Sequence, residues 1–123
     1  MVHKYARYVV KAAAWLEIIV GIVFITAPNV LCVLLFAARP EGLGRPLARW
    51  VGVGLLALGI ACLPSRTPEV HRVAVLGLFV FNLGVAILLA WVGAGATIHG
   101  FALWPVVILH AVIAVALLPL LAI

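Results

Sequence analysis

Four long apolar runs alternate with short polar connections along this chain. The runs cover about residues 9–27, 47–63, 69–92 and 101–121. A helix needs about 20 predominantly apolar residues to cross the hydrocarbon core of a bilayer, and each run comes close to that length. The pattern therefore predicts an all-α fold in which four transmembrane helices form a bundle.

A fifth, shorter apolar segment at about residues 29–38 follows the first run. Pro28 ends the helix before it, because proline lacks the backbone N–H that continuation requires. Proline is also favoured in the first turn of a new helix. Residues 30–38 would span only about 13 Å as a helix, which is less than half the hydrocarbon thickness. We therefore expect a short interfacial or re-entrant helix between the first and second spans.

The composition strengthens the membrane interpretation. Hydrophobic residues make up 68% of the 123 residues and charged residues 9%, and the mean hydropathy is +1.40. A soluble domain is roughly half apolar and a quarter charged. We expect residues 1–123 to form a single integral membrane domain with no soluble domain.

Three polar residues interrupt the apolar runs near their centres: Glu17, Asn82 and His110. Counted at about 1.5 Å per residue from Tyr8, His71 and Ala122, which lie at one end of the predicted bundle, they are roughly 13, 16 and 18 Å deep. An unpaired ionised carboxylate facing lipid at that depth would cost at least about 3 kcal/mol, so Glu17 should face the bundle interior or be protonated. We expect the three residues to form a mid-membrane polar site, with Arg49 as a fourth member.

The chemistry of this site admits more than one interpretation. Glu and His can exchange a proton, and Asn can orient either of them or hold a ligand carbonyl. The predicted function is binding of a lipophilic or amphipathic small molecule, such as a lipid or a quinone. Alternatively, the same residues hydrogen-bond between helices and only fix the packing, as in an accessory subunit of a larger membrane complex.

Several other function classes lack support in the sequence. The chain has no nucleophile elbow, no phosphate-binding loop and no metal-type His or carboxylate pair, so we expect neither an enzyme nor a metal site. No cofactor is expected either, because His71 and His110 differ by about 16 Å in depth and offer no axial pair for haem. Cys32 and Cys62 lie in apolar surroundings and are expected to be free thiols. The sequence contains no basic run with interleaved aromatic residues that would indicate binding of nucleic acid.

The basic residues, which give a net charge of +5, predict the orientation in the membrane. Basic residues favour the cytoplasmic ends of spans. One end of the predicted bundle carries five of them, and the other carries three: Lys4, Arg7, Lys11, Arg66 and Arg72 against Arg39, Arg45 and Arg49. Both termini are therefore expected in the cytoplasm, and a dimer of dual topology remains open.

Glycines on two of the spans predict close helix contacts. Small residues let helix backbones approach each other in a bilayer. Gly52 and Gly59 lie on the second span, and Gly77 and Gly84, seven residues apart, share a face of the third. These faces could also join copies of the chain into a homo-oligomer.

Short motifs along most of the chain resemble those of small bacterial inner-membrane proteins of the DoxX-like type. The resemblance is carried by Ala27-Pro28, the segment 30–36, Arg49-Trp50-Val51-Gly52, Phe81-Asn82-Leu83, Leu103-Trp104-Pro105 and Leu109-His110-Ala111. It implies a four-helix bundle in a family largely without established activity.

A second resemblance concerns the chemistry of Glu17. An acid in the first of four short helices is similar to the arrangement in small multidrug-resistance transporters, in which protons and lipophilic cations share one such acid. The segment after Pro28 and the Arg-bearing connection at residues 39–46 depart from that pattern. The resemblance implies, as an alternative function, a proton-coupled transporter that uses Glu17.

Overall fold

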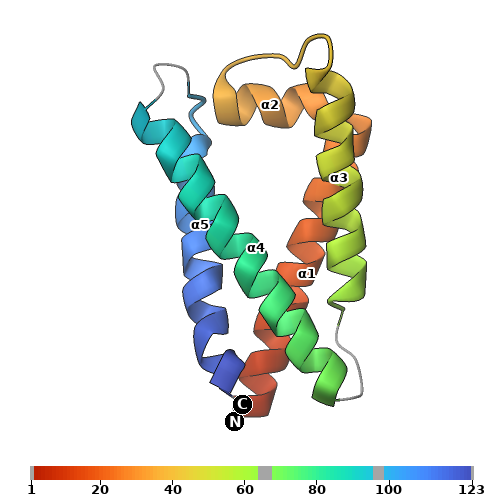
Figure 1. Cartoon of the computed structure of the whole chain (residues 1–123), viewed down its shortest axis with the longest axis vertical. Helices are drawn as coiled ribbons and strands as arrows, with labels where there is room; N and C mark the ends of the chain where they lie inside the picture. The colour runs from red at the N-terminus through yellow and green to blue at the C-terminus, as the bar shows by residue number, and fades with distance from the viewer. Residues whose placement is uncertain (1, 64–67, 96–98, 123) are drawn as a thin grey trace.

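The computed structural model describes residues 2–63, 68–95 and 99–122, and all regular structure in these ranges is helical. The helices are α1 (Val2–Thr26), α2 (Pro28–Phe36), α3 (Gly44–Ala61), α4 (Pro68–Gly95) and α5 (Leu103–Leu117), and α5 continues into the short 3₁₀ helix η1 (Leu118–Ala122). Helices α1, α3, α4 and α5 run along the length of the molecule, and α2 lies across one end, opposite both termini (Figure 1). The all-α prediction is confirmed.

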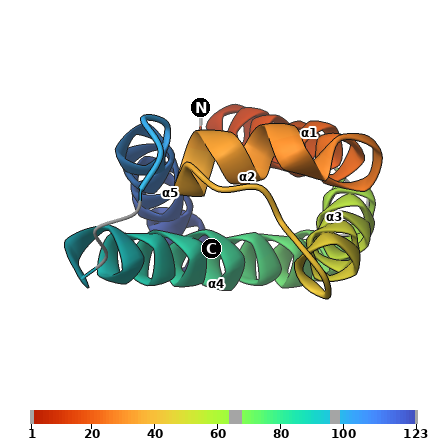
Figure 2. The ribbon, with the colours of Figure 1, turned by 90° about the horizontal axis from the view of Figure 1, so that it is seen from above.

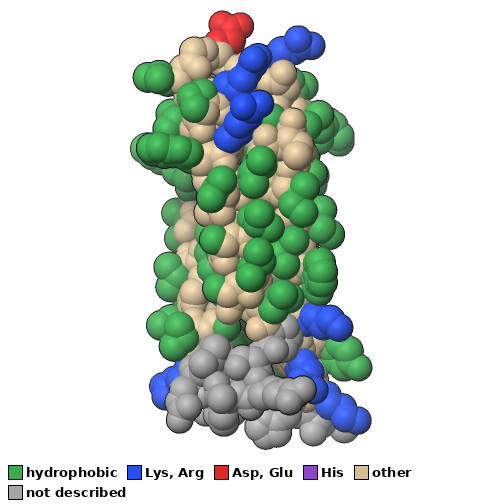
Figure 3. Space-filling model, turned by 90° about the vertical axis from the view of Figure 1, so that its right-hand side faces the viewer, with side chains coloured by type: hydrophobic (Ala, Val, Ile, Leu, Met, Phe, Trp, Pro, Cys, Tyr) green, Lys and Arg blue, Asp and Glu red, His purple; other side chains and the backbone are tan. Residues whose placement is uncertain are grey.

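Within the described ranges, three helices are long and apolar enough to cross a membrane. The candidate spans are Lys4–Thr26, His71–Gly95 and Leu103–Ala122. Apolar side chains cover the middle of the face shown in Figure 3, and Lys and Arg side chains appear towards its two ends. These features indicate an integral membrane protein. The fourth predicted span, at residues 47–63, lies on α3, which carries Arg45 and Arg49 and is not among the candidate spans.

The connection between α1 and α2 follows from Pro28. Helix α1 ends at Thr26, and Pro28 occupies the first turn of α2, where its missing N–H has no helical partner to lose. Helix α2 ends in the left-handed residue Ala37, whose N–H bonds to the Val33 carbonyl at 2.9 Å. The short helix predicted at residues 29–38 is therefore present, and it turns across the bundle end (Figure 2).

Backbone hydrogen bonds attach α2 to the start of α5. The N–H groups of Gly100 and Ala102 donate to the carbonyls of Leu35 and Leu34, at 2.8 and 3.0 Å. These carbonyls lie in the last turn of α2, where a helix has no internal partners for them. A Cβ at Gly100 would overlap the Leu34 carbonyl, so the close approach requires glycine.

Helices α1 and α3 are in backbone contact through three glycines. A Cβ on Gly52 would lie 2.8 Å from the Gly21 carbonyl oxygen, and a Cβ on Gly59 would lie 2.6 Å from that of Ala14. Gly52 and Gly59 therefore pack α3 against α1 within one chain. Gly84, in contrast, is exposed, and nothing lies within 4 Å of the position its Cβ would take.

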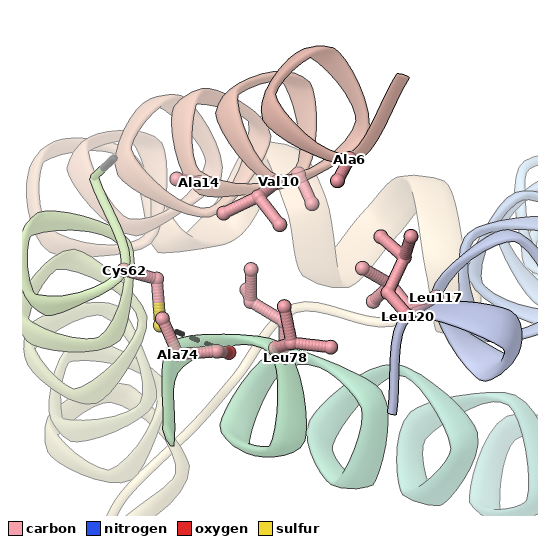
Figure 4. Packing of buried hydrophobic residues seen from close by; sticks show 10 residues of the cluster. Ala6, Val10, Ala14, Cys62, Ala74, Leu78, Leu117 and Leu120 are labelled. Atoms are coloured by element: carbon pink, nitrogen blue, oxygen red, sulfur yellow. Dashed lines mark hydrogen bonds between the residues drawn. The ribbon is translucent and has the colours of Figure 1, made fainter. Parts of the chain in front are cut away.

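A hydrophobic core joins four helical elements towards the end that holds the termini (Figure 4). Cys62 belongs to this core and donates a hydrogen bond from its Sγ to the Ala74 carbonyl at 3.6 Å. The core consists of Ala6, Val10, Ala13, Ala14, Cys62, Ala74, Val75, Leu78, Leu117 and Leu120. Asn82 lies one helical turn beyond Leu78, so the polar residues of the spans follow directly on this core.

Candidate functional site

Glu17 of α1 and Asn82 of α4 are buried polar residues in a largely apolar interior. Their side chains are 1% and 0% exposed, and they are the buried polar residues of the part of the chain that the structure describes. The prediction that Glu17 faces the bundle interior therefore agrees with its burial. Both residues lie next to the core, which fixes the helices that carry them.

Asn82 connects α4 to α5 through His110. Its Nδ2 donates to the Leu78 carbonyl at 2.8 Å, which is the bond to the carbonyl four residues earlier in the same helix. This bond orients the amide, so that Oδ1 accepts from Nδ1 of His110 at 2.7 Å. A neutral imidazole carries one N–H, and here that N–H is on Nδ1. The other ring nitrogen, Nε2, is then an acceptor.

The Glu17 carboxyl group completes a chain of three side chains from three helices. The Asn82 side chain is its polar neighbour. Oε1 of Glu17 is nevertheless buried without a hydrogen-bond partner among the described residues. Leaving a buried polar atom unpaired costs about 1–3 kcal/mol. Glu17, Asn82 and His110 therefore form a connected site in which one strong acceptor is unused.

His110 is held from a second side by Phe81. The two rings meet edge to face, with centroids 6.0 Å apart and planes at 77°. This geometry is one of the favoured arrangements of aromatic rings. His110 itself is only partly buried. Its ring is thus oriented by Asn82 and Phe81 while one part of it remains accessible.

Arg49, the fourth residue predicted for this site, lies elsewhere. It is exposed near the start of α3. Gly59, which packs against Ala14 and Ile18 on either side of Glu17, comes ten residues later in the chain. Ten residues correspond to about 15 Å along a helix. The structure therefore brings together Glu17, Asn82 and His110 and leaves Arg49 outside the group.

An apolar groove, which was not predicted from the sequence, lies between α4 and α5. Its volume is about 430 Å³. Small residues on both helices, including Ala86, Ala90, Ala111 and Ala114, leave this space open, and their spacing of three or four residues was the available signal. The full lining is Phe79, Leu83, Ala86, Ile87, Ala90, Val107, Ala111, Ala114, Val115 and Leu118.

Metal ligands do not gather in the described ranges, where no three His, Cys, Asp or Glu side chains could hold one ion. Cys32 and Cys62 are buried and free, as their apolar surroundings predicted. The groups that converge near Glu17 are a carboxyl, an amide and an imidazole. They are suited to hydrogen bonding and proton exchange.

Comparison with known proteins adds no assignment, because no family model, curated protein or solved structure matches this chain. The resemblance to DoxX-like proteins stays a prediction. The function must therefore be inferred from the geometry of the site and the groove.

Proposed function

We propose that this chain is a small integral membrane protein that binds a lipophilic or amphipathic small molecule at Glu17, Asn82 and His110. The observation that carries the proposal is Oε1 of Glu17, which is buried and has no partner. Residues that only fix helix packing are expected to satisfy each other, since buried polar groups are nearly always hydrogen-bonded. An unused acceptor next to Asn82, which itself binds His110, supports a ligand instead.

The surroundings of the three residues favour an apolar ligand. Binding sites for small molecules are mostly apolar, with a few polar groups that fix the orientation of the ligand. The α4–α5 groove supplies apolar surface along the same helices that carry Asn82 and His110. A molecule with a long apolar part and one polar group fits this combination.

Mass spectrometry of gently extracted protein tests the proposal. A small molecule should co-purify with the wild-type chain and be lost from the His110→Phe variant, which keeps an aromatic ring but no polar atom. Thr26→Val is a matched control, because Thr26 is exposed and its hydroxyl bonds only within α1, to the Ile22 carbonyl at 2.8 Å. Absence of any co-purified molecule from the wild type would contradict the proposal.

A proton-coupled transporter is the second candidate, and the burial of Glu17 favours it. An ionised and unpaired carboxylate is costly inside a membrane, so the charge of Glu17 would be coupled to what lies beside it. In liposomes, Glu17→Gln should then abolish proton movement driven by a lipophilic cation. Unchanged flux in that variant would exclude this function.

The topology that we propose for this function has four spans, with α3 as the fourth. Helix α3 packs along α1 through the close contacts at Gly52 and Gly59. A helix that packs along the length of a transmembrane span is expected to cross the membrane beside it. The location would be a bacterial inner membrane, with both termini in the cytoplasm. Reporter fusions at the N-terminus and after Glu41 test this, because opposite sides are expected for the two positions.

Two further expectations belong to the same proposal. A DoxX-like relationship is consistent with a bundle of this size, and a solved structure of such a protein with the same crosswise α2 would support it.

A homo-oligomer would use the exposed face around Gly84, since Gly52 and Gly59 already contact α1 within the chain. Crosslinking through a cysteine at position 84 tests this contact.

A further inference from the structure

The α4–α5 groove runs directly past the Asn82–His110 pair. On α5, the lining residues Val107 and Ala114 lie about one helical turn on either side of His110. On α4, Phe79 and Ala86 lie about one turn on either side of Asn82. Neither Asn82 nor His110 is among the lining residues, so the helical spacing places their hydrogen bond beside the groove, about halfway along it.

The hydrogen bond also decides which kind of polar group the groove can recognise. Nδ1 of His110 donates to Asn82, so the neutral ring offers only the lone pair of Nε2 to a ligand. Nε2 lies on the side of the ring that faces away from Asn82, and His110 is partly exposed. A ligand group at this position must therefore donate a hydrogen bond.

From these two observations we propose that the ligand is a long-chain molecule with a hydroxyl head group, whose tail lies in the α4–α5 groove and whose hydroxyl donates to Nε2 of His110. This inference rests on the proposed function and narrows its ligand class. A hydroxyl donates, whereas an ether or an ester oxygen only accepts. Long-chain alcohols and quinols fit the site, and the corresponding ethers and quinones do not.

The apolar lining of the groove is suited to the apolar tail of the ligand. Every residue that lines it is apolar, from Phe79 and Leu83 on α4 to Val115 and Leu118 on α5. A charged or branched polar chain would leave its polar atoms unpaired against this surface, which is unfavourable. A single unbranched apolar chain has no such atoms.

Competition between two matched probes tests the inference. The purified protein in nanodiscs is offered hexadecanol or hexadecyl methyl ether, and binding is measured by displacement of tritiated hexadecanol. The alcohol should bind about tenfold more tightly, the effect of one hydrogen bond of about 1.4 kcal/mol in an apolar site. Equal binding of the two probes would overturn the hydroxyl assignment.

Variants of the site separate the head group from the tail. His110→Phe should remove the preference for the alcohol and keep weak binding of both probes. Asn82→Leu should reduce the preference too, because His110 is then free to carry its proton on either nitrogen. A preference that survives both variants would overturn the role of His110.

The groove is tested by Ala111→Phe, which fills it, with Ala57→Phe as the control on the exposed face of α3. The first variant should lose both probes and the second neither. Retained binding in Ala111→Phe would overturn the groove assignment. If Ala111→Phe loses self-association while probe binding is unchanged, the groove assignment is overturned too. A second copy of the chain would then cover the groove.

One pattern distinguishes this inference from the proposed function on which it rests. If neither probe binds but another molecule co-purifies and is lost in His110→Phe, the hydroxyl and groove assignments fail and the proposed function stands. If neither probe binds and no molecule co-purifies, both fail.

Discussion

Nδ1 of His110 lies 2.7 Å from Oδ1 of Asn82, and this contact joins α4 to α5 in the middle of their lengths. The same amide bonds the Leu78 carbonyl and neighbours Glu17 of α1. Asn82 is thus the central residue of the polar site.

Replacing Asn82 should destabilise the protein. In Asn82→Leu, Nδ1 of His110 loses its acceptor while remaining partly buried, and we expect a loss of about 1–3 kcal/mol in the free energy of unfolding. Thermal unfolding in detergent, followed by circular dichroism, measures this. Asn29→Leu is the matched control, because Oδ1 of Asn29 is buried and unpaired, and its removal should leave the stability unchanged or raised. Equal melting temperatures for Asn82→Leu and the wild type would contradict the hydrogen bond.

Replacing Glu17 should reduce the binding of the ligand without reducing the stability of the protein. Glu17→Leu removes an unpaired buried oxygen, so the free energy of unfolding without ligand should not fall. The amount of co-purified molecule should fall at least severalfold. These two measurements are made on the same preparation. A large loss of stability would show that the carboxyl group is needed for packing.

Two glycines of α3 should respond differently to alanine. Gly59→Ala places a methyl group 2.6 Å from the Ala14 carbonyl oxygen and should push α1 and α3 apart, at a cost of about 1–3 kcal/mol. Gly54→Ala meets nothing within 4 Å and should be neutral or stabilising by up to about 1 kcal/mol. Chemical denaturation in mixed micelles compares them. Similar effects of the two changes would contradict the glycine contact.

The attachment of α2 should depend on Gly100. A methyl group there would overlap the Leu34 carbonyl and break the hydrogen bonds from Gly100 and Ala102. In Gly100→Ala, amide hydrogen exchange at Ala102 should become at least about tenfold faster, because the N–H loses its protection. Gly95→Ala, with no atom within 4 Å of the new Cβ, serves as the control. Slow exchange at Ala102 in Gly100→Ala would show that α2 is held by other contacts.

The pattern of apolar residues does not by itself fix the number of transmembrane spans. Helices α1, α4 and α5 satisfy both length and apolarity. Helix α3 has Arg45 and Arg49 in its first turns, so its own sequence does not indicate a span with the same clarity. Its contacts with α1, made by Gly52 and Gly59, are what favour a crossing.

The sequence by itself determined the helices and the depth of their polar residues. Helix periodicity and the rise per residue are local properties, so Pro28, the short helix after it and the similar depths of Glu17, Asn82 and His110 could be predicted. Only the tertiary structure decided how the helices are rotated and tilted. Rotation set the tautomer of His110 through Asn82, left Oε1 of Glu17 without a partner and placed Arg49 outside the site. It also opened the α4–α5 groove, because a groove exists only where small residues from two helices face each other.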